Sequence, residues 1–240
     1  MRKDLRPFWV KKLYLRYRKW YTYHFIEPRC DYLGSYPTFM KPWHVHLSGP
    51  NIEIGDSVTV IGEPHSPVNI SVWGRELGQG SIKIGNAVLL SPGTRISASD
   101  EIVIGDSVMT ANGVYITDSD WHGIYDRIER DEKATPVSIG NNVWLCDNAT
   151  VLKGVTIGEN SIIAASAVVT RDIPANVVAA GNPAKIVKQL DPQARYVTRA
   201  EFFSEPLQKQ QFFEEVERTI LAENGTLNWL RALFFPARKD

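Results

Sequence analysis

His122 is the residue whose type and position in this sequence best suit chemistry. It ends the run Ile116-Thr-Asp-Ser-Asp-Trp-His, where a regular apolar pattern stops and a long charged loop begins. Catalytic groups concentrate on loops that leave a rigid scaffold, and histidine changes protonation near neutral pH. We therefore predict that His122 is a general base. Asp118 and Asp120 are both candidates to orient its imidazole, although both residues equally suit a solvated turn.

The other four histidines have weaker claims to a chemical role. His44 and His46 alternate on one face of the expected first strand, and His24 lies in an aromatic helix, so we expect structural roles for these three. His65 lies in a proline-flanked loop with no partner in view.

The scaffold that must position His122 is indicated by an aliphatic residue at every sixth position. Helices repeat apolar residues near every 3.6 positions and simple strands every second one, so strict sixes predict a coil of triangular cross-section. Gly, Asn and Asp beside the anchors suit tight corners.

Three hexapeptides make one turn, so Ile84 and Ile102 are expected to stack in one interior column. The alternative is a β-sandwich with chance spacing. The anchors are Ile84, Leu90, Ile96, Ile102, Ile139, Leu145, Val151, Ile157, Ile163 and Val169.

The pattern divides the chain into three segments and predicts an all-β solenoid with flanking helices. Residues 1–43 form a basic, aromatic helical segment, residues 44–190 the repeat coil, and residues 191–240 a C-terminal helical segment. Loops at residues 74–80 and 123–136 interrupt the coil.

Composition narrows the function classes. The 240 residues are 43% hydrophobic, which is enough for a substantial core, and the net charge of zero gives no global field that selects nucleic acid. Residues 1–24 nevertheless hold eight Lys or Arg against the single acid Asp4. Cys30 and Cys146 are too few for a disulfide framework and favour a reducing compartment. Because no stretch approaches transmembrane length, we expect a cytoplasmic protein or one attached peripherally at the inner face of a membrane.

Four stretches carry a resemblance to a known family. They are Ile104-Gly-Asp-Ser-Val, Ile139-Gly-Asn-Asn-Val-Trp, Val151-Leu-Lys-Gly-Val-Thr-Ile-Gly, and Val168-Val-Thr-Arg-Asp-Ile-Pro followed by Gly181-Asn-Pro-Ala. The segment resembles the hexapeptide-repeat acyltransferases, most closely the galactoside and maltose O-acetyltransferases and their envelope-polysaccharide relatives. The resemblance implies a left-handed parallel β-helix, a homotrimer with active sites in the grooves between subunits, and acetyl-CoA or another acyl-CoA as donor, with no metal required.

The resemblance also implies roles for individual residues. His122 would deprotonate the acceptor hydroxyl while that oxygen attacks the thioester directly, without an acyl-enzyme. Residues on matching positions would contact CoA, namely Ala111, Trp144, Ala165, Thr170, Arg171, Pro183, Lys185 and Lys188. On the acceptor side Ser91 and Ser99, with the adjacent Asp100, replace an asparagine and an aspartate of the family. Because of that departure, a simple galactoside or maltose is not expected as acceptor. The acceptor class stays broad: a hydroxyl on a small molecule, a saccharide or a lipid-linked compound.

Two other functions compete with acyl transfer. Gamma-type carbonic anhydrases use a similar prism but need three histidines around zinc, and His122 has no histidine neighbour in the sequence. The other alternative is a non-catalytic scaffold that binds a membrane or partner proteins. The terminal segments suit either a lipid interface, through interleaved aromatic and basic residues, or the capping of the open ends of the coil.

Overall fold

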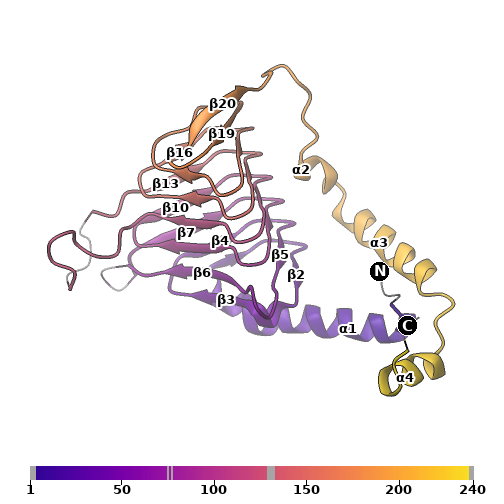
Figure 1. Cartoon of the computed structure of the whole chain (residues 1–240). Helices are drawn as coiled ribbons and strands as arrows, with labels where there is room; N and C mark the ends of the chain where they lie inside the picture. The colour runs from indigo at the N-terminus through magenta and orange to yellow at the C-terminus, as the bar shows by residue number, and fades with distance from the viewer. Residues whose placement is uncertain (1–3, 75, 77, 129–132, 238–240) are drawn as a thin grey trace. The chain divides into compact units, whose positions relative to one another are not determined.

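The chain winds into a coil of short strands, three to a turn, so that each strand from β1 to β15 pairs with the strand three places further on (Figure 1). The structure is a computed structural model that describes residues 4–74, 76, 78–128 and 133–237. Every pairing between the named strands is parallel except β19 with β20, which is antiparallel. The parallel strands expected from the sequence are therefore present.

The strands form three sheets, one for each side of the coil. Sheet A contains β1 (Tyr32–Leu33), β4 (Ile52–Ile54), β7 (Ser81–Ile84), β10 (Glu101–Ile104), β13 (Val137–Ile139) and β16 (Thr156–Ile157). Sheet B contains β2 (Thr38–Met40), β5 (Thr59–Ile61), β8 (Leu89–Leu90), β11 (Met109–Thr110), β14 (Trp144–Leu145), β17 (Ile162–Ile163), β19 (Val177–Ala180) and β20 (Lys185–Gln189). Sheet C contains β3 (Val45–Ser48), β6 (Val68–Val72), β9 (Arg95–Ala98), β12 (Tyr115–Thr117), β15 (Thr150–Val151) and β18 (Val168–Val169).

The six-residue anchors fill the interior of the coil. All ten are buried, and removing such aliphatic side chains from water is the main stabilising term of a solenoid. The expected stacking of Ile84 on Ile102 is wrong, because Ile84 pairs with Ile104 and Ile102 pairs with Ile82. The third side of this turn, from Ile96 to Ile104, is two residues longer than a hexapeptide, which shifts the register between successive turns.

Corners of the coil depend on residues that tolerate a left-handed backbone. Asn142, Asn160 and Asn176 all have positive φ, between 56° and 59°, where asparagine costs less than most side chains. Their amides also form a ladder: Asn142 Nδ2 donates to Asn160 Oδ1 at 2.9 Å, and Asn160 Nδ2 to Asn176 Oδ1 at 3.1 Å. The ladder ties three successive turns together at one corner.

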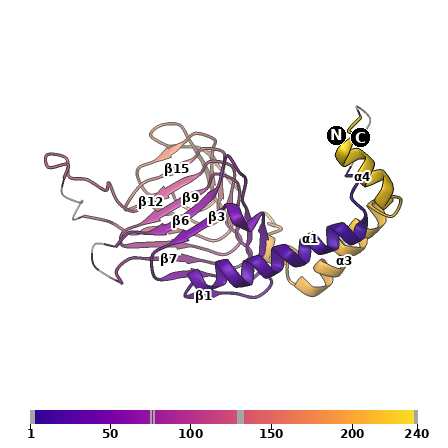
Figure 2. The same ribbon diagram turned by 90° about the horizontal axis from the view of Figure 1, so that it is seen from below.

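Two excursions leave the coil where the chain passes from sheet C to sheet A. The first separates β6 from β7 and the second separates β12 from β13, and both project from the same edge in Figures 1 and 2. They contain the two loops expected from the sequence. His122 lies at the start of the second excursion.

Helices flank the coil in the sequence. The first, α1 (Phe8–Tyr21), continues into a π-helical turn at Thr22–Ile26 and a 3₁₀ turn at Glu27–Arg29. After the coil come α2 (Arg199–Phe202), α3 (Pro206–Ile220) and α4 (Thr226–Phe234). The strands begin at Tyr32, earlier than the boundary at residue 44 drawn from the sequence. No helix in the described ranges combines the length and the apolar character needed to cross a bilayer.

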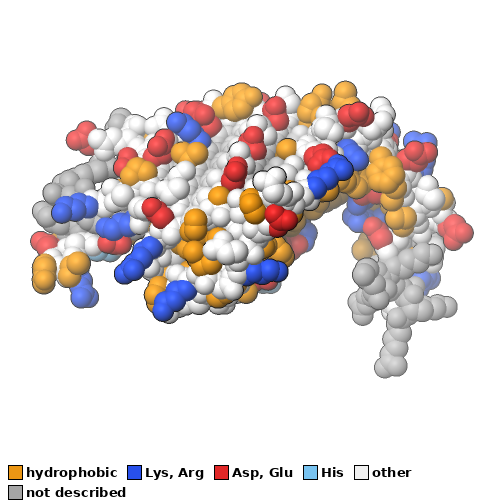
Figure 3. Space-filling view, turned by 90° about the horizontal axis from the view of Figure 1, so that it is seen from above, with side chains coloured by type: hydrophobic (Ala, Val, Ile, Leu, Met, Phe, Trp, Pro, Cys, Tyr) orange, Lys and Arg blue, Asp and Glu red, His pale blue; other side chains and the backbone are white. Residues whose placement is uncertain are grey.

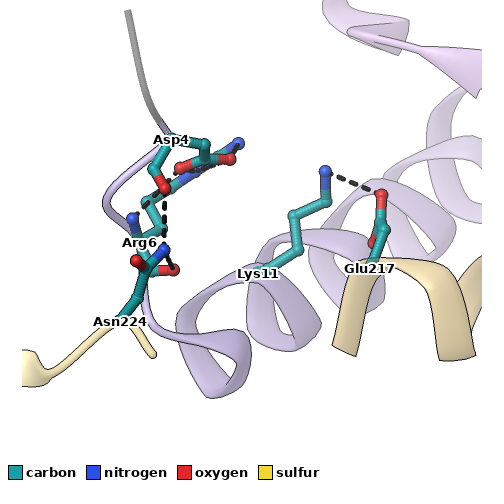
Figure 4. A network of polar contacts seen from close by, with 5 residues as sticks. All are labelled: Asp4, Arg6, Lys11, Glu217 and Asn224. Atoms are coloured by element: carbon teal, nitrogen blue, oxygen red, sulfur yellow. Dashed lines mark hydrogen bonds and ion pairs between the residues drawn. The ribbon is translucent and has the colours of Figure 1, made fainter. Parts of the chain in front are cut away.

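The described chain forms two compact units. One contains residues 21–204, and the other joins the described residues up to Trp20 with those from Glu205 onward. Within the second unit Lys11 pairs with Glu217 at 2.9 Å, and Asn224 Nδ2 donates to the carbonyl oxygens of Asp4 at 2.7 Å and Arg6 at 3.0 Å (Figure 4). These contacts show that the two ends of the chain pack on each other.

Charged side chains are mixed on the face shown in Figure 3. Acidic and basic groups are interspersed on the coil there, and neither sign dominates. This distribution agrees with the net charge of zero.

Candidate active site

An open hollow of about 410 Å³ lies beside His122, on the side of the coil formed by sheet C. It is lined by Trp73, Arg95, Ser97, Tyr115, Trp121 and His122. The lining comes from two neighbouring strands of one sheet, β9 and β12, and from the starts of both excursions, which follow β6 and β12 (Figure 2).

The register of sheet C brings the lining residues together. Arg95 lies directly beside Tyr115, and Ser97 beside Thr117. Arg95 and Tyr115 each precede a buried anchor, Ile96 and Ile116, so the alternation of a strand turns their side chains outward. The Arg95 guanidinium carbon is 3.8 Å from the centre of the Tyr115 ring, a stacked cation–π contact.

The backbone at Trp121 presents His122 to solvent. Trp121 has a φ of 68°, a left-handed conformation that costs a bulky residue about 1–2 kcal/mol. Its N–H donates to Ser119 Oγ at 3.1 Å, which helps to hold that conformation. Such strain is common at functional sites, where the surrounding structure maintains it. The His122 side chain is exposed at the edge of the hollow.

Neither candidate carboxylate contacts the imidazole. Asp118 is fully buried, and its two oxygens accept the backbone N–H groups of Ser99 at 2.7 Å and Asp100 at 2.8 Å. Burial raises the pKa of this carboxyl above its ordinary value, and the two N–H donors oppose the rise. Asp120 forms an ion pair with Lys153 at 2.7 Å. Among the described residues, His122 has no carboxylate partner. Asp118 instead binds backbone N–H groups, and Asp120 binds a lysine side chain.

The three expected acceptor residues lie at two corners. Ser99 and Asp100 form the corner between β9 and β10 that Asp118 holds, two residues from the Ser97 side chain in the hollow. Ser91 lies at the corner after β8, where its N–H donates to Thr110 Oγ1 at 3.1 Å. None of the three lines the hollow itself.

The eight residues expected to hold CoA lie on other parts of the coil. Trp144 is on β14 in sheet B with 43% of its surface exposed, and Ala111 and Ala165 follow the sheet B strands β11 and β17. Thr170 and Arg171 follow β18 and are exposed. Pro183 follows a cis peptide bond after β19, and Lys185 and Lys188 are exposed on β20. None of the eight lines the hollow beside His122.

The cysteine thiols are poor nucleophiles in this structure. Burial raises the pKa of Cys30 to about 12 and also raises that of Cys146. A thiolate is the reactive form of cysteine, so neither residue is poised to accept an acyl group. In the described part of the chain, no three His, Cys, Asp or Glu side chains gather as ligands for a metal ion.

Sequence reasoning missed most of the hollow. Arg95, Tyr115, Trp73 and Ser97 are separated by up to 42 positions and carry no motif. One signal was available: Arg95 stands directly before the repeat anchor Ile96, and Tyr115 stands directly before another aliphatic residue, Ile116. Only the register that joins β9 to β12 shows that the two aliphatic residues are neighbours.

Comparison with known proteins finds a family that part of the repeat resembles. Residues 136–171 match the family described as bacterial transferase hexapeptide (six repeats). Over 97 residues the chain is 36% identical to galactoside O-acetyltransferase of Escherichia coli, which covers 40% of this chain and 47% of that protein. The matches span 33% to 47% of the length of the curated relatives compared.

A solved structure shares the fold. AntD, an N-acyltransferase from Bacillus cereus in complex with dTDP and 3-hydroxybutyryl-CoA, has a TM-score of 0.51 at 14% identity, covering 79% of this chain and 96% of that one. A hexapeptide-repeat acetyltransferase from Vibrio cholerae, complexed with acetyl-CoA, has a TM-score of 0.48 at 22% identity, covering 72% and 78%. The resemblance to hexapeptide-repeat acetyltransferases, as indicated by the sequence, is confirmed over the matched segment.

Proposed function

We propose that this protein is a CoA-dependent O-acyltransferase, most simply an O-acetyltransferase, built on a left-handed parallel β-helix. The observation that carries the proposal is the position of His122: an exposed imidazole beside a hollow, on a coil whose repeat is similar to that of galactoside O-acetyltransferase. An uncharged imidazole at neutral pH is a suitable base for a hydroxyl group.

Transfer proceeds in one ternary complex. The acceptor oxygen attacks the thioester carbonyl carbon while His122 removes the hydroxyl proton, and the resulting oxyanion needs an N–H or water donor. The carbon–sulfur bond then breaks, and the imidazolium returns its proton to the CoA thiolate. The raised pKa values of both cysteines support this direct route over an acyl-cysteine intermediate.

A homotrimer with shared grooves is part of the proposal. His122 belongs to the edge between sheets C and A, whereas the proposed CoA residues lie on sheet B and the last turns. Because one chain does not bring these two groups into one hollow, a groove between two subunits is the simplest way to join them. The proposed donor contacts are those carried over from the family: Ala111, Trp144, Ala165, Thr170, Arg171, Pro183, Lys185 and Lys188.

A peripheral location at the inner face of a membrane also remains a proposal. The basic and aromatic character of residues 1–24 supports it. A non-catalytic scaffold is the alternative function, and measurable acetyl-CoA cleavage dependent on an acceptor excludes it.

The test is replacement of His122 by Ala. Turnover should fall by about 10² to 10⁴, the usual worth of a general base, with little change in CoA affinity. The matched control is His65→Ala, which removes an exposed histidine that does not line the hollow. Steady-state CoA release and calorimetric CoA binding give the two readouts. Near-normal turnover in His122→Ala contradicts the assignment.

A further inference from the structure

Arg95 is an exposed cation with a fixed position and no acid beside it. Its guanidinium carbon lies 3.8 Å from the centre of the Tyr115 ring, and no described carboxylate is within ion-pair distance of it. Stacking engages the flat face of a guanidinium and leaves its in-plane N–H donors available. Such a group is pre-arranged to bind a carboxylate or a phosphate through two parallel hydrogen bonds.

The rest of the hollow suits a ring attached to that anion. Trp73 has 55% of its surface exposed, and Trp121 forms part of the same lining, so two indole side chains offer apolar contact area. Ser97 and His122 add a hydroxyl and an imidazole to the same lining. None of the six lining residues is acidic.

Two of the carboxylates near the hollow are already engaged. Asp120, next to Trp121, forms its ion pair with Lys153, and Asp118 is buried under two N–H donors. Arg95 is the one permanently charged side chain among the six lining residues, and its field favours an anion.

We infer that the hollow is an acceptor subsite for an anionic hydroxyl compound, in which Arg95 binds a carboxylate or phosphate while His122 faces the hydroxyl that is acylated. Trp73 and Trp121 contact the ring or chain between those two groups. The inference rests on the proposed acyl transfer and adds to it the charge of the acceptor and its specificity residue.

The experiment compares a neutral sugar with two acidic derivatives of it, which carry the negative charge at different carbons. Galactose, galacturonate and galactose 1-phosphate are the probes, and the two acidic sugars separate a carboxylate ligand from a phosphate ligand. Each is tested with the full-length protein as an acceptor in acetyl-CoA cleavage, and separately for binding by saturation-transfer NMR without acetyl-CoA. The variants are Arg95→Gln and Arg95→Lys, with Arg29→Gln as the control at an exposed arginine outside the hollow.

We expect the wild-type protein to prefer one acidic sugar over galactose by about tenfold in KM or in binding. Arg95→Gln should abolish that preference, so that the acidic sugars and galactose give values within about twofold of each other. Arg95→Lys should retain part of it, because a lysine keeps the charge but not the paired donors. Arg29→Gln should behave as the wild type does.

Other outcomes overturn the inference in distinguishable ways. If the wild type and Arg95→Gln both show the same KM and binding for neutral and acidic sugars, the anion subsite is contradicted and the proposed acyl transfer is not. If Arg95→Gln weakens CoA affinity instead, the residue belongs to the donor site. Because the NMR arm does not need turnover, preferential binding of an acidic sugar without any acceptor-dependent CoA release supports the subsite and contradicts the proposed function.

Discussion

At the residue scale, backbone geometry and not a carboxylate sets the position of the proposed base. The left-handed Trp121 turns the chain immediately before His122, and its N–H is held by Ser119. Asp118, which the sequence offers as an orienting residue, instead holds the corner at Ser99 and Asp100. Asp118 therefore supports the site by holding the backbone of that corner.

Replacing Asp118 by Asn tests that structural role. An amide has one acceptor oxygen where the carboxylate has two, so one of the buried N–H donors loses its partner. The free energy of unfolding should fall by roughly 1 to 3 kcal/mol at neutral pH, the cost of one unsatisfied buried donor. Asp120→Asn, which breaks a partly exposed ion pair, should cost less than about 1 kcal/mol. Urea unfolding of the two variants provides the comparison.

The raised pKa of Asp118 also predicts how the difference in free energy of unfolding between the wild type and Asp118→Asn depends on pH. The folded-state pKa lies above the ordinary value of 3.8, so between these two values the folded protein binds more protons than the unfolded chain. The contribution of Asp118 to the free energy of unfolding must then decrease as pH rises from about 4 through the folded pKa. The advantage of the wild type over Asp118→Asn should accordingly be larger near pH 4 than at pH 7. An advantage that grows with pH shows that the folded pKa is lowered, not raised.

At the element scale, each short strand has one inward and one outward position with different tasks. In β13 the side chain of Ile139 is buried in the interior column, whereas Ser138 is exposed on the outside. The same alternation leaves the residues before Ile96 and Ile116 free to build the hollow on sheet C.

Two substitutions at neighbouring residues of β13 test whether inward and outward positions contribute differently to stability. Ile139→Ala should reduce the free energy of unfolding by about 2–5 kcal/mol, since it leaves a cavity in a packed interior. Ser138→Ala, one residue away, should change it by less than about 0.5 kcal/mol. Chemical denaturation at one fixed protein concentration compares the two. Similar losses at both positions contradict the inward and outward assignment.

At the scale of the whole molecule, the separation of His122 from the proposed donor residues makes assembly a functional question. Light scattering at micromolar concentration should show a stable trimer. A sharper readout mixes two inactive proteins, His122→Ala and the double variant Arg171→Ala with Lys188→Ala, and refolds them together. Activity should return to about a quarter of the wild-type value, because roughly one groove in four then joins two intact sides. A fully active monomer, or a mixture with no recovery, contradicts shared grooves.

The terminal unit permits a separate test of membrane contact. Residues 1–24 carry seven net positive charges, but Arg6, Lys11 and Lys12 already face Asp4, Glu217 and Glu214. The remaining charge should still give binding to anionic vesicles that weakens with salt, because screening acts over about 8 Å at physiological ionic strength. Sedimentation with anionic and neutral vesicles at two salt concentrations measures it. Absence of binding to both kinds of vesicle removes the membrane proposal and leaves acyl transfer unaffected.

The sequence by itself determined the repeat, the buried anchors, the two interruptions and the prominence of His122. These features are local: each is visible within one or two hexapeptides, since an aliphatic side chain every six residues fills one side of the coil. The match of residues 136–171 to the hexapeptide family rests on the same short-range signal.

Only the tertiary structure decided which turns face each other. The pairing of Ile82 with Ile102, the stacking of Arg95 on Tyr115 and the capture of two N–H groups by Asp118 all join residues about 20 positions apart. Their register depends on the length of every corner between them, and one side two residues longer than a hexapeptide was enough to shift it. The packing of α1 with α3 and α4 spans almost the whole chain and follows from no local pattern. Contacts of that kind are set by how complete surfaces fit, which no single repeat encodes.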